Sequence, residues 1–192
     1  MMKNVVFFIS LAMLLLFSTF SLFDKGNGQS RAVMGTAVQE NTLAKAIMPT
    51  RMEIPSIKLV APIEPVSLLA NGQMGAPASF KKAGMLVPWT KPGEKGTAVI
   101  AGHFDHYTGP AIFYDLRKLK PGDQVFLYDK TDQKLVFTVK AVESFPTKEA
   151  PVEKIFSNTS AAQLNLITCD GKFNRKRQEH NRRLVVFTEL AS

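Results

Sequence analysis

Hydrophobic positions along this chain occur in short runs that Pro and Gly interrupt, a pattern typical of β-strands joined by turns. The clearest run covers residues 163–170 (QLNLITCD), where Leu164, Leu166 and Ile167 suit a strand that is buried on both faces. We expect Cys169 to lie where this strand ends in a loop. At such a position the strand holds the backbone rigid while the side chain stays accessible to a ligand.

Other segments have the composition of short strands, and the predicted ranges are 52–60, 61–69, 84–89, 97–101, 124–128, 135–142 and 184–190. Apolar residues at helical spacing predict a helical segment at 111–119, and a helical turn is expected near 152–156. The chain shows no alternation of strands with helices. The sequence therefore predicts an all-β fold, a closed β-barrel or a sandwich of about eight strands with a few short helices.

The N-terminal segment has a different character, because residues 5–23 carry no charge and follow Lys3. As a helix this segment would reach roughly 28 Å, close to the thickness of a bilayer core. It is either a cleaved signal peptide or a retained anchor. No Ala-x-Ala site follows it directly, so we expect a signal-anchor at 1–23 with Lys3 on the cytoplasmic side. The polar residues 24–50 predict a flexible stalk, and 51–192 a globular domain.

The chain has 192 residues and a net charge of +8, and its 45% hydrophobic and 21% charged content is that of a globular protein. A basic surface favours an anionic neighbour such as nucleic acid, a lipid headgroup or an acidic polymer. Charge alone does not choose among them. Cys169 is the single cysteine, so in an exported domain it cannot form a disulfide within the chain. It is then either an inert buried thiol or a nucleophile.

A thiol performs acyl chemistry as a thiolate, so it needs a base or a cationic neighbour. His103 is the best candidate base because it directly follows the apolar run 97–101, with Gly102 allowing the backbone to turn. His106 lies in a polar loop, and His180 lies in a basic loop where we expect it to be solvated. A metal pair of His103 and His106 has no evident third ligand, so no metal site is expected.

Arg182 and Arg183 lead into the last predicted strand. A guanidinium stays protonated and cannot act as a base, but it can donate hydrogen bonds to a carbonyl or a developing oxyanion. Alternation along the strand does not decide which arginine points to a site, because each shares its face with apolar residues of 184–190. The alternative is a pair of solvated charges at the start of a strand.

Together these segments resemble the sortases, the membrane-anchored cysteine transpeptidases of Gram-positive bacteria. The resemblance covers roughly residues 51–192, and it rests on AVIAGH at 98–103, LITC at 166–169 and Arg182 before the last strand. It implies a sortase-like closed β-barrel that uses no cofactor. It also implies a single-pass protein of the cell membrane whose catalytic domain is extracellular and has no nucleic-acid partner.

The resemblance further implies a reaction. Cys169 would attack the Thr–Gly bond of a Leu-Pro-x-Thr-Gly-type sorting signal of a surface protein, and an amine of a cell-wall precursor would then displace the resulting thioester. His103 would exchange the proton, and Arg182 would hold the substrate carbonyl and the oxyanion. Thr168 would hydrogen-bond the substrate, and Ile167 would help to line an apolar groove.

Segments IPSI at 54–57, API at 61–63 and GPAIF at 109–113 look most like the class F sortases. The loop 172–183 departs from the pattern, since it holds six Lys or Arg residues against one Glu and ends in two arginines. The catalytic arginine could therefore also be Arg183. The competing hypothesis is a membrane-tethered basic β-domain that binds anionic cell-wall polymer without catalysis. No acidic cluster suggests the calcium site of some relatives.

Overall fold

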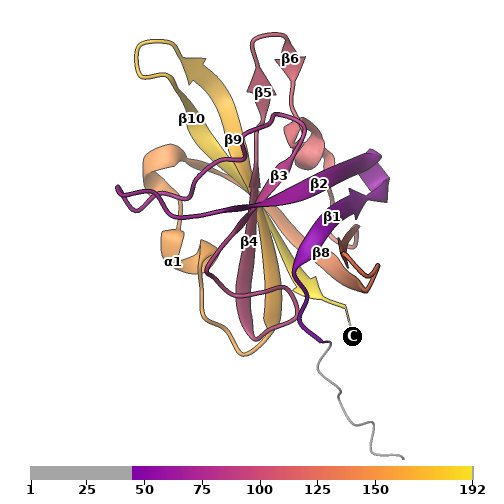
Figure 1. Cartoon of the computed structure of the whole chain (residues 1–192). Coiled ribbons are helices and arrows are strands. Elements are labelled where there is room, and N and C mark those ends of the chain that lie inside the picture. The colour runs from indigo at the N-terminus through magenta and orange to yellow at the C-terminus, as the bar shows by residue number, and fades with distance from the viewer. Residues whose placement is uncertain (1–44, 192) are drawn as a thin grey trace, which may run out of the picture. The chain divides into compact units, whose positions relative to one another are not determined.

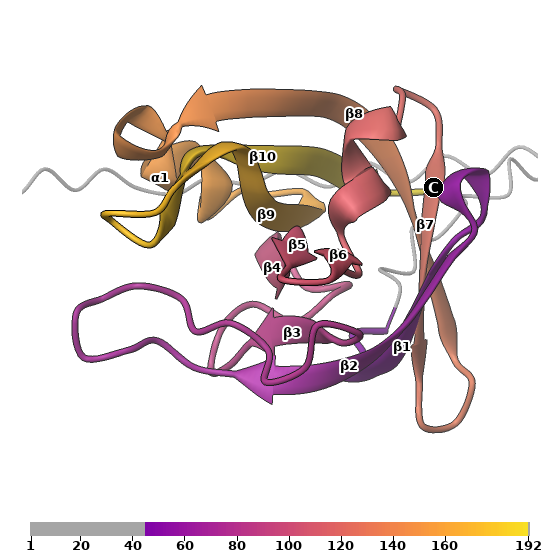
Figure 2. The same cartoon turned by 90° about the horizontal axis from the view of Figure 1, so that it is seen from above.

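A computed structural model describes residues 45–191 of the chain, which form a closed β-barrel of eight strands (Figure 1). This confirms the predicted all-β barrel. The strands follow one another around the barrel in the order β1-β2-β3-β4-β9-β10-β8-β7, and Figure 2 shows them as a ring seen from above. The barrel strands are β1 (Pro49–Ile54), β2 (Leu59–Val66), β3 (Ala83–Leu86), β4 (Gly96–Gly102), β7 (Gln124–Asp129), β8 (Lys134–Pro146), β9 (Ala162–Asn174) and β10 (Glu179–Leu190).

Short elements complete the fold. A small hairpin consists of β5 (Asp105–His106) and β6 (Gly109–Pro110), and the one α-helix within residues 45–191 is α1 (Val152–Ile155). The 3₁₀ helices are Pro55–Ile57, Tyr114–Lys118 and Thr147–Glu149. The segment predicted to be helical at 111–119 thus contains a 3₁₀ helix.

The predicted break between the first two strands is wrong. Pro55 begins a 3₁₀ turn that ends at Lys58, which has a φ of 53° in the left-handed region, so the chain turns there and β2 already starts at Leu59. The first strand also begins at Pro49, ahead of the expected domain boundary, and Ile47 is buried. Its N–H donates to the carbonyl of Pro92 over 3.0 Å.

Parallel pairing of β4 with β9 and antiparallel pairing of β9 with β10 create the part of the barrel that matters for function. Along β9, Leu164, Leu166 and Thr168 point into the barrel, where the two leucines belong to the main hydrophobic core. The alternate residues point outward. The outward-facing Asn165 is nevertheless buried, because its side-chain amide donates to the carbonyl of Ile155 at the end of α1. The prediction of a strand buried on both faces is therefore confirmed.

Two details predicted around β9 are wrong. Cys169 lies inside β9 and not at its end, because the strand continues to Asn174. The basic loop expected at 172–183 is largely a hairpin, since β10 already begins at Glu179 and Glu179 pairs with Asn174. Backbone hydrogen bonds between antiparallel strands hold this hairpin without an apolar alternation, so its sequence does not reveal it.

Within residues 45–191 no helix is long and apolar enough to cross a membrane. The predicted signal-anchor at 1–23 and most of the predicted stalk lie outside the described residues.

Candidate functional site

Cys169 projects from the outer face of β9 and is half-buried. It lies two residues beyond Ile167, which shares that face and is also half-buried. The outer face before it is covered, since Val185 and Ile155 are buried there. The thiol thus sits where the covering of the sheet ends, accessible on one side and packed on the other.

His103 directly follows β4, the parallel neighbour of β9. The register pairs Ala101 with Ile167, and His103 and Cys169 each lie two residues further along the same direction. Because side chains alternate along a strand, both belong to the outer face of the sheet. A buried hydrogen bond of 2.8 Å from the Thr168 hydroxyl to the carbonyl of Gly102 joins the two strands just before them.

The imidazole of His103 is held by the connection between β2 and β3. Its Nε2 lies 2.9 Å from the carbonyl oxygen of Pro77, and its ring centroid lies 4.6 Å from that of Phe80. A carbonyl can only accept a hydrogen bond, so the proton of the neutral ring is on Nε2. Nδ1 of His103 is then the ring nitrogen with a lone pair available to take a proton.

The two terminal arginines point to different faces of β10. Arg183 is the direct cross-strand partner of Cys169, whereas Arg182 pairs with Asp170. Directly opposite residues in an antiparallel pair have their side chains on the same face, so Arg183 shares the face of Cys169. Arg182 turns away, donating from Nε to the Ser144 hydroxyl over 2.8 Å and from Nη2 to the Ser144 carbonyl over 2.6 Å.

The guanidinium of Arg183 is fixed through one nitrogen. Its Nη1 donates to the Thr147 hydroxyl over 3.1 Å, to the His180 carbonyl over 3.2 Å and to the Arg182 carbonyl over 3.0 Å. Within residues 45–191, no acceptor forms a hydrogen bond with Nε or Nη2 of Arg183. Those donors are free to bind a ligand next to the thiol.

Charges around the thiol act in opposite directions. Burial raises the pKa of Cys169 above its ordinary value, the nearby Arg183 lowers it, and Asp105 raises it. Burial is the largest of the three effects. The neutral thiol is therefore the favoured form at neutral pH, and Arg183 is the group that offsets part of this preference.

His180 does not occupy the solvated position that the sequence predicted. It is only 7% exposed, and its Nε2 lies 3.0 Å from a carboxylate oxygen of Asp105. Sequence reasoning missed Asp105 because its partner is 75 residues away in the chain. Asp105 stands only two positions after the candidate base His103, and this nearness in the sequence is the signal that could have pointed to it.

His106 belongs to a separate cluster. Its ring stacks on Phe80 at a centroid distance of 4.9 Å, and its Nδ1 lies 3.0 Å from the Thr108 hydroxyl. In the part of the chain that the structure describes, no group of three or more His, Cys, Asp or Glu side chains is arranged to hold a metal ion. The single ring of Phe80 thus packs against both of the histidines that were considered as a metal pair.

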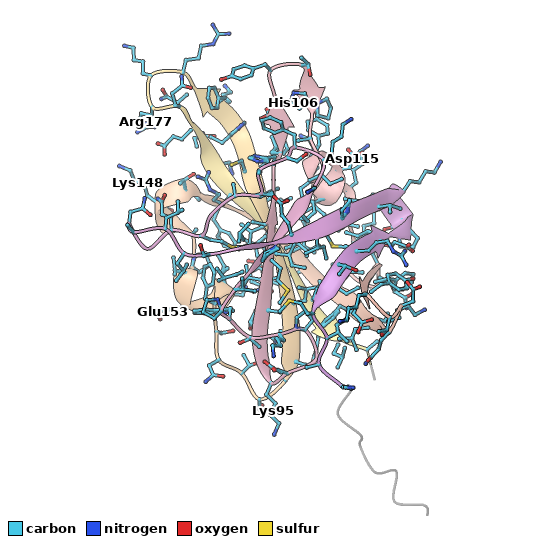
Figure 3. All side chains as sticks on the ribbon, in the orientation of Figure 1. Lys95, His106, Asp115, Lys148, Glu153 and Arg177 are labelled. Carbon is cyan, nitrogen blue, oxygen red and sulfur yellow. The ribbon has the colours of Figure 1, made fainter. Side chains whose placement is uncertain are left out.

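A cavity of about 520 Å³ is lined in part by Phe80, whose ring packs against that of His103. Its polar lining includes His106 and Asp115, which Figure 3 shows at the same corner of the molecule. Cys169 is not among its lining residues. His103 is not among them either, so the cavity is lined by neither the candidate base nor the thiol.

The comparisons with known proteins concern the family and the fold. A protein-family model described as a sortase domain matches residues 52–191. Sortase C from Clostridium perfringens SM101 is 23% identical, with a TM-score of 0.55 over 76% of this chain and 73% of that one. Sortase C-1 from Actinomyces oris is 23% identical, with a TM-score of 0.58 over 77% of this chain and 74% of that one. Sortase A from Listeria monocytogenes is 24% identical, with a TM-score of 0.55 over 77% of this chain and 89% of that one. No match was found among curated proteins.

Fold and site together define a closed β-barrel that carries a half-buried thiol, an imidazole and a guanidinium on one stretch of its outer surface. The chain belongs to the sortase family, whose members are cysteine transpeptidases. The solved structures support the fold, and their names include sortases of classes A and C.

Proposed function

We propose that this protein is a membrane-anchored cysteine transpeptidase that cleaves a Leu-Pro-x-Thr-Gly-type sorting signal between Thr and Gly and transfers the acyl group to an amine of a cell-wall precursor. The observation that carries the proposal is the shared outer face of Cys169, His103 and Arg183 within a sortase domain. No other cysteine is available as a nucleophile. These three side chains supply a nucleophile, a proton carrier and a fixed positive charge.

The first half-reaction breaks the peptide bond. The thiol proton of Cys169 passes to Nδ1 of His103, and the sulfur attacks the threonine carbonyl carbon to give a tetrahedral oxyanion. When this intermediate collapses, the C–N bond breaks and the imidazolium returns its proton to the leaving glycine amine. The product is a thioester on Cys169 and a peptide with a free amino terminus.

The second half-reaction reverses the roles. An incoming amine gives up a proton to His103 as its nitrogen attacks the thioester carbonyl, and the C–S bond breaks. The released thiolate of Cys169 recovers the proton from the imidazolium. The site thus returns to its starting state, and one peptide bond has been exchanged for one amide bond.

Arg183 replaces Arg182 in this mechanism. Nε and Nη2 of Arg183 are available beside the thiol. Nε and Nη2 of Arg182, in contrast, both donate hydrogen bonds to Ser144. A guanidinium beside the reacting carbonyl stabilises the oxyanion as it forms. It also stabilises the thiolate, which matches its effect on the pKa of Cys169.

Thr168 and Ile167 take different roles. Thr168 is 3% exposed, and its hydroxyl is donated to Gly102, so we assign it to holding β4 and β9 together and not to a substrate hydrogen bond. Ile167 is half-buried on the face of Cys169 and would contact apolar side chains of the signal. Val152, in the connection after β8, is 62% exposed and is a further candidate for such a contact.

The class, anchoring and location of the enzyme rest on its sequence. The segment GPAIF at 109–113 supports membership of class F, and the uncharged residues 5–23 support a single membrane anchor with the barrel outside the cell. The +8 net charge suits an anionic cell-wall environment.

The test uses the full-length protein with a panel of short sorting-signal peptides and an amine acceptor, analysed by mass spectrometry. The wild type should release the C-terminal fragment and accumulate an acyl-enzyme heavier by the N-terminal fragment. Cys169→Ala should abolish both products, and Arg182→Gln serves as a control on the opposite face of β10. Activity that survives in Cys169→Ala would refute the proposal.

Thiol labelling distinguishes the competing non-catalytic hypothesis. A protein that only binds wall polymer would show salt-sensitive polymer binding, slow labelling of Cys169 and no peptide turnover. The transpeptidase should be labelled at Cys169 and protected from labelling by the sorting-signal peptide.

A further inference from the structure

Two hairpins project side by side from the barrel, β5–β6 and the outer part of β9–β10 (Figure 1). Asp105 in β5 and His180 in β10 join them, with 3.0 Å between a carboxylate oxygen and Nε2. The His180 side chain is 8% exposed and that of Asp105 is 41% exposed. Asp105 is thus partly accessible to solvent, while His180 is buried. Neither residue has a role in the reaction described above.

The imidazole of His180 is enclosed by two aromatic rings. Phe104 and Phe173 approach it edge-on, with centroid distances of 5.5 Å and 5.2 Å. Its Nδ1 lies 3.4 Å from the carbonyl oxygen of Gly171. Both ring nitrogens therefore face oxygen atoms, and these contacts hold the ring in one orientation.

The backbone of His180 connects the pair to the site. Its carbonyl oxygen accepts hydrogen bonds from the Thr147 hydroxyl over 3.0 Å and from Nη1 of Arg183 over 3.2 Å. The same Thr147 hydroxyl accepts from Nη1 of Arg183. Any movement of His180 would therefore displace two of the acceptors that fix the guanidinium.

We propose that Asp105 is a positioning residue, whose carboxylate anchors the buried ring of His180 and thereby holds the guanidinium of Arg183 in place beside Cys169. The proposal rests on the function proposed above, in which Arg183 stabilises the thiolate and the oxyanion. It differs from a purely structural role, because the loss should appear in the steps that use Arg183.

Charge near the thiol gives a second consequence. Asp105 raises the pKa of Cys169 and Arg183 lowers it, so removal of either charge should shift thiol reactivity along the pH axis in opposite directions. The carboxylates of the outer β9–β10 hairpin are engaged elsewhere. Glu179 pairs with Arg177 in an exposed ion pair, and the carboxylate of Asp170 accepts from Ser144.

The experiment compares Asp105→Asn, Asp105→Ala and His180→Gln with the matched control Glu179→Gln, which removes a carboxylate next to His180 in the β9–β10 hairpin. Melting temperatures first establish that each variant is folded. Pre-steady-state acylation by a sorting-signal peptide should be about tenfold slower in Asp105→Ala and His180→Gln, with kcat affected more than KM. In an Arg183→Gln background, Asp105→Ala should produce no further loss, and Glu179→Gln should match the wild type throughout.

Iodoacetamide labelling of Cys169 as a function of pH provides a readout that needs no peptide. Asp105→Asn should shift the profile to lower pH, because the negative charge is removed while the side chain keeps its size and its acceptor oxygen. Full acylation rates and an unchanged labelling profile in the folded Asp105 variants would overturn the inference. An active Cys169→Ala would instead refute the transpeptidase itself, so the two failures are distinguishable.

Discussion

The Thr168 hydroxyl donates a 2.8 Å hydrogen bond to the carbonyl of Gly102 inside the barrel, and each of these residues directly precedes a member of the candidate site. Cys169 and His103 are 66 residues apart in the sequence, the same separation as that of the bonded pair. One buried bond between parallel strands therefore fixes the point at which both side chains leave the sheet.

Removal of this bond should cost both stability and activity. Thr168→Val keeps the shape of the side chain but leaves the buried carbonyl of Gly102 without its partner, which should lower the free energy of unfolding by about 1–3 kcal/mol. Acylation should also slow, since His103 and Cys169 lose their common support. Urea unfolding and single-turnover kinetics measure the two effects.

Thr188→Val is the matched control for this prediction. Its hydroxyl makes the same kind of buried bond, 2.7 Å to the carbonyl of Leu164, between β10 and β9. It should destabilise the protein by a similar amount with little effect on the acylation rate of the folded fraction. Equal kinetic losses in the two variants would contradict the special position assigned to Thr168.

The reactivity of Cys169 should depend on pH in a way that Arg183 controls. Burial raises the thiol pKa, so the midpoint of the alkylation rate against pH should lie above that of a cysteine in an unstructured peptide. Arg183→Gln removes the charge that lowers this pKa and should move the midpoint further up. Arg182→Gln should leave it in place, because Arg182 lies on the other face of β10.

The same shift has a consequence for stability. A group whose pKa is raised on folding contributes stability that is fully present below its unfolded pKa and is lost as the pH rises through the folded pKa. The wild type should therefore lose stability in the alkaline range relative to Cys169→Ala. Thermal unfolding across that range, with the two proteins compared at each pH, measures the difference. A constant difference at all pH values would be inconsistent with a raised thiol pKa.

Gly102 should not tolerate a larger side chain. A Cβ at this position would lie 2.5 Å from a ring carbon of Phe113, which is fully buried in the core. Gly102→Ala should destabilise the fold by about 1–3 kcal/mol and displace His103, which follows it. Equilibrium unfolding measures the loss. In a Phe113→Ala background the same substitution should cost much less, and equal costs in both backgrounds would show that the ring is not the obstacle.

The barrel was predictable from the sequence because its strands are apolar on the inward face and end at turn residues. His103 and Cys169 could be named as candidates for a related reason, since each follows an apolar run. Which arginine shares the face of Cys169 was not predictable. The register of β9 with β10 shifts between His180 and Arg182, and such an irregularity changes which side chain faces Cys169.

The surroundings of the candidate site could not be predicted from the sequence either. Asp105 and His180 form their bond across 75 residues, and nothing in either local segment indicates the other. The charges of the β9–β10 hairpin resemble those of a solvated loop, yet His180 is enclosed by Phe104 and Phe173. Burial of a polar residue in such a segment depends on which hairpin lies next to it, and only the fold determines that.

The loop that holds His103 should weaken in acid, through Glu64. The carboxylate of Glu64 accepts a hydrogen bond of 3.0 Å from the Lys82 ammonium and one of 2.7 Å from the Ala78 N–H. Ala78 directly follows Pro77, whose carbonyl binds the His103 ring. The bond from Lys82, followed by that from the Ala78 N–H, holds the pKa of Glu64 below its ordinary value. A lowered pKa means that the stabilising effect exists above the unfolded pKa and is lost as the pH falls through the folded one.

Glu64→Gln should therefore mimic the acid state of this loop at neutral pH. Faster hydrogen exchange of the Ala78 amide and slower acylation are expected, because Pro77 no longer holds the His103 ring in one orientation. As the pH falls through the folded pKa of Glu64, the wild-type rate should approach that of the variant. Glu94→Gln is the control, since Glu94 accepts from the Lys91 N–H in a similar turn. A rate ratio between wild type and Glu64→Gln that stays constant with pH would separate Glu64 from the positioning of His103.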